Sequence, residues 1–196
     1  AKQPFNPKPG DLKFKDANGD GVIDAKDRVV VPGAFPKFDY SSSINLSWKN
    51  FDLSAFIQGV YGLKATTQGL TWGLTPYIQG SPPPVDFVKD GWTGEGSTNK
   101  NPAMYISGYG PVTGTTSTYF LLNASYVRLK NLAVGYDIPG SLSRKIGFKD
   151  IRVYVSGDNM ITITKWPGSD PEKANTGWFE AYPQLKTYTL GIKVKL

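Results

Sequence analysis

The sequence predicts an all-β protein, in which antiparallel strands form a segment of a transmembrane β-barrel. Three observations predict this fold. Apolar and polar residues alternate with a period of two over stretches of 11 residues, aromatic residues mark the strand ends, and one connection is too long for a compact soluble domain. The 196 residues include 22 Gly and 15 Pro, which favours strands and turns over helices. No apolar run reaches about 18 residues, so the sequence predicts no transmembrane helix.

The first two strands are predicted as a hairpin. In residues 38–48 the apolar side chains share one parity, and Asp, Ser or Asn occupies every intervening position. Lys49 and Asn50 then predict a two-residue turn, because Asn tolerates the positive φ of tight hairpins. Residues 51–61 repeat the alternation and form the return strand. An irregular, Pro-rich segment, residues 1–37, precedes the hairpin.

A second hairpin and a final strand follow a long connection. In the first strand of this hairpin, the apolar parity slips near Lys130 and Asn131, which predicts a β-bulge. The predicted elements, in order, are loop 62–124, strands 125–137 and 150–162, loop 163–183 and strand 184–196.

Strand length favours a membrane barrel over a soluble β-sandwich. About 11 residues, rising about 3.3 Å each and tilted about 45°, span roughly 25 Å, which is the height of the apolar band of an outer-membrane barrel. Sandwich strands are usually about 5–6 residues long. Aromatic residues also lie at the strand ends, where a barrel has its aromatic girdles. They are Phe38, Trp48, Phe51, Tyr61, Tyr126 and Tyr136.

Composition excludes several kinds of chemistry. The chain has no Cys and no His, which rules out disulfides, thiolate nucleophiles, Cys/His zinc sites and Ser-His-Asp triads. No pair of carboxylates can be placed across a cleft from spacing alone, so we expect no enzyme. The net charge is +6, but Lys and Arg are dispersed and no RNA-recognition signature is present, so we expect no nucleic-acid partner.

Residues 16–27 match the spacing of an EF-hand calcium loop. Oxygen ligands are expected at positions 1, 3, 5, 7, 9 and 12 of such a loop, with Gly at position 6 for the sharp turn. Position 12 is Asp instead of the usual Glu, and no amphipathic helices flank the loop, so we expect a structural Ca²⁺ site and not a sensor. A metal-free surface turn is the alternative. The expected ligands are Asp16, Asn18, Asp20, the Val22 carbonyl, Asp24 and Asp27.

Four of the five Trp residues lie in the predicted loops. Their functional interpretation is stacking on sugars or peptides at the outer mouth of the barrel. The alternative, which we favour, is packing that holds the long loops together. These candidate ligand-binding residues are Trp72, Trp92, Trp166 and Trp178.

Several blocks of sequence closely resemble the C-terminal segment of SusC/RagA-type TonB-linked outer-membrane transporters of Bacteroidetes. The resemblance runs nearly end to end and is weakest over residues 62–117. It is carried by Gly10–Asp24, Pro36–Phe38, Phe51–Phe56 with Gln58–Gly59, Tyr126–Leu132 with Gly135–Tyr136, Val153–Asn159, and Tyr182–Gln184 with Thr187–Gly191.

The resemblance implies a fold, a location and partners. Members of the family form a 22-stranded barrel closed by an N-terminal plug, import glycans or peptides with energy from TonB, and work under a SusD-like surface lipoprotein. This chain would supply the last five strands, embedded in outer-membrane lipid, while the plug and the segment that contacts TonB lie outside it. Five crossings that start from outside place residues 1–37, and the calcium-like loop within them, on the cell surface.

We therefore expect part of a nutrient importer, which cannot transport by itself because five strands leave two open edges. The rival hypothesis from another class is a secreted, calcium-dependent carbohydrate-binding β-domain, in which the loop Trp residues form the stacking platform.

Overall fold

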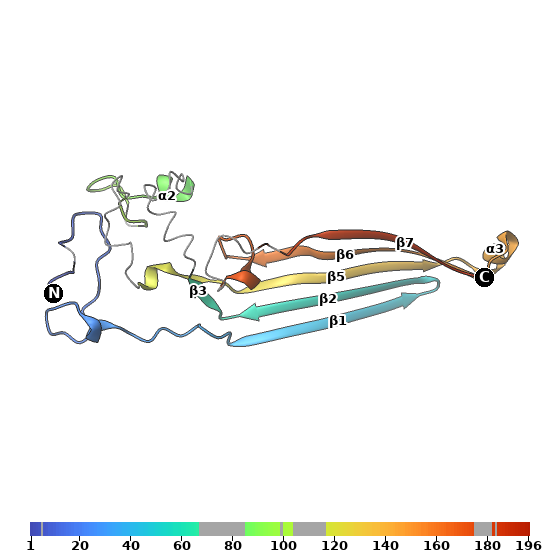
Figure 1. Cartoon of the computed structure of the whole chain (residues 1–196), viewed down its shortest axis with the longest axis horizontal. Coiled ribbons are helices and arrows are strands. Elements are labelled where there is room, and N and C mark those ends of the chain that lie inside the picture. Colours follow the sequence, from blue (N-terminus) through green and yellow to red (C-terminus); the bar gives the residue numbers. More distant parts are fainter. Residues whose placement is uncertain (5, 67–84, 99, 104–116, 175–181, 183) are drawn as a thin grey trace. The chain divides into compact units, whose positions relative to one another are not determined.

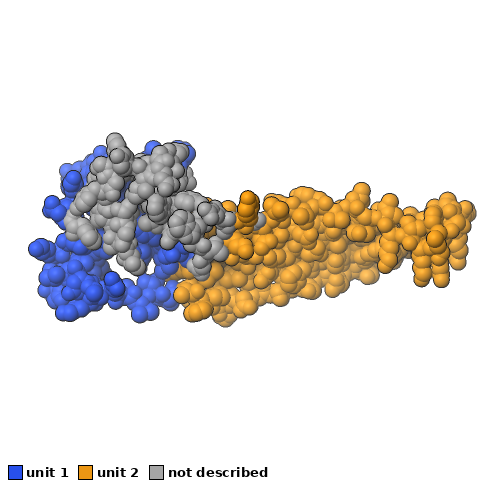
Figure 2. Space-filling view, in the orientation of Figure 1, with its two compact units in different colours: residues 1–32, 65–122, 175–180 blue, residues 33–64, 123–174, 181–196 orange. Residues whose placement is uncertain are grey.

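The computed structural model describes the chain except for residues 5, 67–84, 99, 104–116, 175–181 and 183. It divides into two compact units (Figure 2). Unit 1 consists of Ala1–Pro32, Ala65–Leu122 and Asn175–Glu180. Unit 2 consists of Gly33–Lys64, Asn123–Ala174 and Ala181–Leu196, and it contains the large sheet.

Unit 2 is built on one antiparallel sheet of five strands (Figure 1). The spatial order of the strands is their order along the chain, and each one pairs with its sequence neighbour in the sheet. The strands are β1 (Phe38–Trp48), β2 (Phe51–Tyr61), β5 (Tyr126–Asp137), β6 (Asp150–Thr164) and β7 (Thr187–Lys195). β1 and β7 are edge strands, so the sheet is an open segment and not a closed barrel. This agrees with the predicted fold class.

The last strand differs from its expected bounds, which were 184–196. Gln184 does not extend the ladder, because its backbone N–H donates to the Asp170 carboxylate at 2.8 Å. The next carbonyl, of Leu185, accepts from the Asn159 side chain at 3.1 Å. These contacts divert the backbone, so β7 starts only at Thr187. β6, in turn, extends two residues beyond its expected end at residue 162.

The remaining elements are short. The predicted loop 62–124 contains β3 (Lys64–Thr66), α2 (Val85–Lys89), η2 (Thr118–Phe120) and β4 (Leu121–Asn123), and β3 and β4 form a separate two-stranded sheet. The other elements are η1 (Ala25–Asp27), α3 (Gly140–Ser143), η3 (Arg144–Ile146) and η4 (Pro171–Lys173). No helix in the described part of the chain is long and apolar enough to cross a membrane.

The β-bulge predicted in β5 is confirmed at Lys130. Leu129 pairs with Ile57 and Asn131 pairs with Phe56, so Lys130 has no partner in β2. The register with β6 shifts at the same point. The bulge shifts the alternation by one residue and thereby keeps the apolar residues on one face of the sheet along the whole of β5.

The register gives the sheet one apolar face and one polar face. Cross-strand neighbours on the apolar face are apolar or aromatic, as in the pairs Leu46 with Leu53 and Val155 with Leu190. On the polar face Ser, Thr, Asn and charged residues face each other, as in the pair Asn131 with Asp158. Every residue of β1 is exposed, because no second layer covers the edge of the sheet.

Few apolar side chains are buried. Among the described residues, the buried hydrophobic positions are Ala65, Phe120, Ala124, Tyr126, Ile151, Trp166 and Ala174. Most of them lie outside the strands, so the long sheet has little core of its own.

Candidate calcium, ligand and wall sites

The calcium-like loop of unit 1 is folded by its own carboxylates. Asp16 accepts hydrogen bonds from the backbone N–H groups of Gly19 and Gly21, at 2.6 and 2.9 Å. Asp20 accepts from the N–H of Val22 at 2.9 Å. Gly21, at position 6, has φ +87°, a left-handed conformation that Gly adopts without strain. The sequence therefore folds locally into the tight turn that an EF-hand loop requires.

Asp27 closes this loop from position 12. One carboxylate oxygen accepts from the N–H of Ala17 at 2.8 Å, and the other accepts from the N–H of Asp24 at 2.8 Å. Hydrogen bonds from Asp24 and then Ala17 lower the pKa of Asp27 below its usual value, because they stabilise the ionised form. Asp27 is thus held as a carboxylate beside the first residues of the loop.

The expected ligands differ in what they contact. Ile23, at position 8, donates its N–H to the Lys2 carbonyl at 3.2 Å, while the Val22 carbonyl accepts no hydrogen bond from any described residue. The Asn18 amide and the Asp20 carboxylate bond each other at 2.9 Å. Within the described residues, no three Asp or Glu side chains already stand close enough to hold a metal ion. All six expected ligands belong to one loop, and all of them except the Val22 carbonyl are engaged with backbone groups or with each other.

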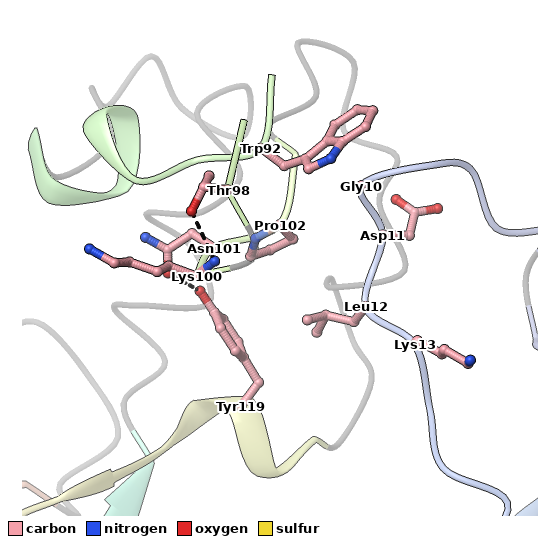
Figure 3. Close-up of a pocket in the computed structure, with 10 residues that line it drawn as sticks. All are labelled: Gly10, Asp11, Leu12, Lys13, Trp92, Thr98, Lys100, Asn101, Pro102 and Tyr119. Atoms are coloured by element: carbon pink, nitrogen blue, oxygen red, sulfur yellow. Dashed lines mark hydrogen bonds between the residues drawn. The ribbon is translucent and has the colours of Figure 1, made fainter. Parts of the chain in front are cut away.

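Trp92 lines a cavity of about 280 Å³ in unit 1 (Figure 3). Its indole packs against the backbone of Gly10, where any β-carbon would collide with the ring. The Tyr119 hydroxyl donates to the Asn101 amide oxygen at 2.8 Å, and burial raises the pKa of Tyr119 to about 12. The lining residues are Gly10, Asp11, Leu12, Lys13, Trp92, Thr98, Lys100, Asn101, Pro102 and Tyr119.

Of the other loop Trp residues that the structure describes, Trp166 does not line this cavity. Trp166 belongs to unit 2, is only 7% exposed, and covers Gly168 with its indole. Little of its surface is left for stacking on a ligand. Trp72 and Trp178 lie outside the described residues.

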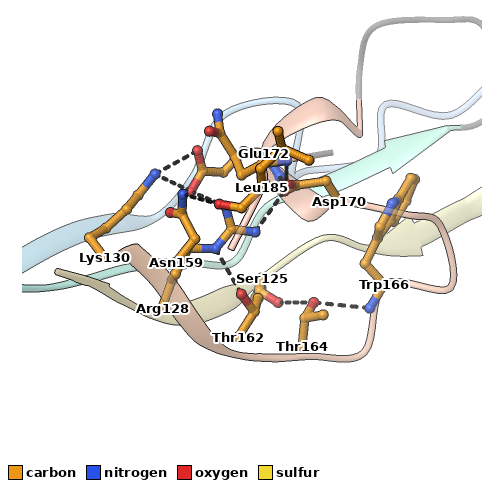
Figure 4. A network of polar contacts seen from close by, with 11 residues as sticks. Ser125, Arg128, Lys130, Asn159, Thr162, Thr164, Trp166, Asp170, Glu172 and Leu185 are labelled. Carbon is orange, nitrogen blue, oxygen red and sulfur yellow. Dashed lines mark hydrogen bonds and ion pairs between the residues drawn. The ribbon is translucent and has the colours of Figure 1, made fainter. Parts of the chain in front are cut away.

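The structure also contains a buried ion cluster that spacing did not reveal (Figure 4). Arg128 of β5 contacts Asp170 at 2.8 Å and Glu172 at 3.0 Å, and Lys130 contacts Glu172 at 2.7 Å. The side chains of Arg128 and Asp170 are 3% and 2% exposed. Arg128 and Lys130 thus both bind carboxylates from the loop after β6.

Hydrogen bonds from the protein keep Asp170 ionised. Burial raises the pKa of this carboxyl, but hydrogen bonds from Arg128 and from the backbone N–H groups of Gln184 and Glu172 outweigh burial and lower the pKa below its usual value. The signal for this site was the parity of Arg128, which falls on the polar face. The loop carboxylates that it binds lie 42 and 44 residues away, and no local pattern links them.

A second ion-paired group crosses the polar face near the opposite strand ends. Arg152 of β6 binds Asp52 of β2 with two contacts, at 2.6 and 2.7 Å, and Asp137 of β5 at 3.2 Å. Gly135 of β5 lies between β2 and β6, and a β-carbon there would collide with Arg152 and Asp52. Gly135 therefore lets the ion pair pass over β5 and tie three strands together.

Comparison with curated proteins finds TonB-dependent receptors. The chain is 31% identical over 199 residues to TonB-dependent receptor P3 of Formosa agariphila, covering 95% of this chain and 19% of that protein. It is 30% identical over 203 residues to receptor P26 of the same organism, covering 94% of this chain and 19% of that protein. It is 28% identical over 203 residues to SusC of Bacteroides thetaiotaomicron, covering 97% and 18%. No protein-family model matches the chain.

Solved structures show the same relationship. The fold matches a chain of the RagAB peptide transporter with a TM-score of 0.71 and 25% identity, covering 89% of this chain and 20% of that one. TM-scores are 0.70 and 0.69 for RagAB in its "open-open" and "closed-closed" states. This chain therefore spans about a fifth of its relatives, which are receptors and transporters and not enzymes. It is homologous, over nearly its whole length, to a segment of the SusC/RagA-type TonB-dependent receptors.

Proposed function

We propose that the chain forms part of the wall and the external loops of a TonB-dependent importer in the outer membrane. The observation that carries this proposal is the sheet of unit 2, whose long antiparallel strands expose one continuous apolar face and match the RagA fold. In such a barrel, lipid contacts the apolar face and the polar face lines the interior.

Exposure supports this assignment of the two faces. Trp48 is 67% exposed, Leu190 is 77% exposed and Ile163 is 69% exposed, and all three lie on the apolar face by register. Exposed apolar patches of this extent are rare on soluble monomers but are normal where lipid is the solvent. The paired aromatic rings Phe38 with Tyr61 and Phe51 with Tyr136 lie at opposite ends of the strands, as aromatic girdles do.

The proposed partners follow from the relatives. The remaining strands would pair with the open edges of β1 and β7, and a plug would occupy the interior. A SusD-like lipoprotein is proposed at the outer surface, and TonB would act through a segment outside this chain. The substrate is proposed to be a nutrient, an oligosaccharide or a peptide; the RagAB relative is described as a peptide transporter. Trp92 and its cavity are candidates for ligand contact in the loops.

Alternating accessibility along β7 tests the wall. Single Cys residues at Thr187, Tyr188, Thr189 and Leu190 should react alternately with a water-soluble maleimide in intact membranes. We expect labelling at 187 and 189 and protection at 188 and 190, because these pairs lie on opposite faces. Detergent micelles provide the matched control for folding, and equal labelling at all four positions would contradict a lipid-facing wall.

Calcium binding is proposed for the loop 16–27. Three features support it: the tight turn of the loop, the ionised Asp27 carboxylate, and the Val22 carbonyl, which accepts no hydrogen bond from a described residue. Binding would require Asn18 and Asp20 to break the hydrogen bond between them and to coordinate the ion instead. Calorimetry with Ca²⁺ alone should show binding at up to about millimolar affinity, as in extracellular modules. Asp20→Ala should abolish it, and Asp39→Ala, which removes an exposed acid outside the loop, should not. No heat of binding at millimolar Ca²⁺ would refute the site.

A further inference from the structure

The ion cluster of Arg128 fastens a loop segment to the polar face of the sheet. Arg128 lies on this face by register, since it pairs with Gln58 on one side and Thr162 on the other. Its guanidinium donates to the Thr162 hydroxyl at 2.8 Å and binds Asp170 and Glu172, which belong to residues 165–174. Each of these contacts lies within unit 2.

Several further contacts hold this segment, residues 165–174. At its start, the Trp166 N–H donates to the Thr164 hydroxyl at 3.0 Å, which in turn donates to the Ser125 carbonyl at 2.8 Å. Asp170 is the N-cap of η4, because its carboxylate accepts a hydrogen bond from the Glu172 N–H at 2.9 Å. Two further residues of the segment, Pro171 and Ala174, are buried.

The charges of the cluster are balanced. Two cations, Arg128 and Lys130, meet two carboxylates, Asp170 and Glu172, with distances of 2.7 to 3.0 Å. Removing either partner of such a buried pair leaves an uncompensated charge, which is strongly unfavourable. The Arg128 guanidinium is thereby withdrawn from contact with a ligand, while Lys165 and Ser169 on the segment remain exposed.

We infer that residues 165–174 are a fixed segment of the inner wall and that Arg128 holds this segment in position. At the end of the strands where Arg128 lies, this segment lines the passage in place of the polar surface of β5 and β6. The inference rests on the proposed function, because it takes the polar face as the interior.

Cysteine accessibility tests the inference, because this chain contains no Cys of its own. Ser169→Cys reports on the exposed side of the segment, and Ala174→Cys reports on its buried side. Both are introduced into the otherwise unchanged protein in intact membranes and reacted with a water-soluble maleimide. We expect the thiol at position 174 to react at least about tenfold more slowly than the thiol at position 169. Adding Asp170→Asn should abolish this difference, because the buried Arg128 then loses its principal partner.

The controls separate the possible causes. Asp39→Asn removes the same charge from an exposed position on the polar face and should leave the thiol at position 174 protected. If Asp170→Asn fails to assemble, Thr162→Val removes one contact of Arg128 without changing charge and should give a smaller increase in labelling. Unchanged protection of position 174 in the assembled variant, or rapid labelling of Ala174→Cys in the otherwise unchanged protein, would overturn the inference. The alternating labelling of β7 tests the wall independently.

Discussion

A double-mutant cycle on Arg128 and Asp170 should show that the cluster is held by charge balance. The cluster is neutral in the native protein, with Lys130 and Glu172 as its other members. Arg128→Met leaves a net charge of −1 and Asp170→Asn leaves +1. The double variant is neutral again, because the contact of 2.7 Å between Lys130 and Glu172 remains.

Burial sets the expected magnitude. The side chains of Arg128 and Asp170 are 3% and 2% exposed, so solvent screens their interaction little. Breaking a buried pair by removing one partner costs about 3–5 kcal/mol, and Glu172 partly compensates, so we expect about 3 kcal/mol for either single variant. Removing both partners together should cost less than either single change, because no charge is then left unpaired. The coupling energy should exceed about 2 kcal/mol.

Hydrogen exchange of residues 165–174, followed by mass spectrometry in lipid, measures this effect. A loss of about 3 kcal/mol in local opening free energy corresponds to roughly a hundredfold faster exchange. The matched control is Asp90→Asn, whose partner Lys100 is 72% exposed; there we expect about 0–1 kcal/mol, measured on its own segment. Equal effects at Asp170 and Asp90, or strictly additive effects in the cycle, would refute a charge-balanced cluster.

Three further predictions concern single groups. Hydrogen bonding lowers the pKa of Asp27, so the hydrogen bond from the Ala17 N–H should stabilise the fold fully above the unfolded-state pKa near 3.8. This stability should be lost as the pH falls through the lowered pKa of the folded state, and the amide NMR shift of Ala17 would follow the loss. Tyr119, with a pKa of about 12, should stay neutral at pH 11 by ultraviolet titration, and its region should lose stability between pH 10 and 12. Gly135→Ala should lower thermal stability, but much less in a background that carries both Arg152→Ser and Asp52→Ser, where neither the guanidinium nor the carboxylate opposes the new methyl.

The strands could be predicted from the sequence because their information is local. In β1 and β2 the alternation is unbroken and a two-residue turn fixes the register, so their observed bounds are those expected. The bulge at Lys130 was also visible, since an extra residue must shift the parity of everything after it. The expected β-barrel segment follows from these same patterns.

The contacts of the site could not be predicted, because they join residues far apart in the chain. The parity of Arg128 placed it on the polar face, but nothing local indicated that Asp170 would return to it. The start of β7 differed for the same reason, since the Gln184 N–H that would extend the strand is taken by Asp170. The loop 16–27 could be recognised from spacing, because its carboxylates accept hydrogen bonds from backbone N–H groups of the same short segment.

The distribution of burial argues against the soluble rival, a secreted β-domain. A sandwich needs a second sheet large enough to cover the apolar face of the first. The other sheet of the described residues pairs only β3 and β4, of three residues each, whereas the main sheet has strands of 9 to 15 residues. The loop that does fold back, 165–174, covers the polar face and leaves Ile161 and Ile163 exposed on the other. The charged cluster around Arg128 is thus covered while apolar groups on the opposite face are exposed, the arrangement expected when lipid contacts one face and the protein interior lies on the other.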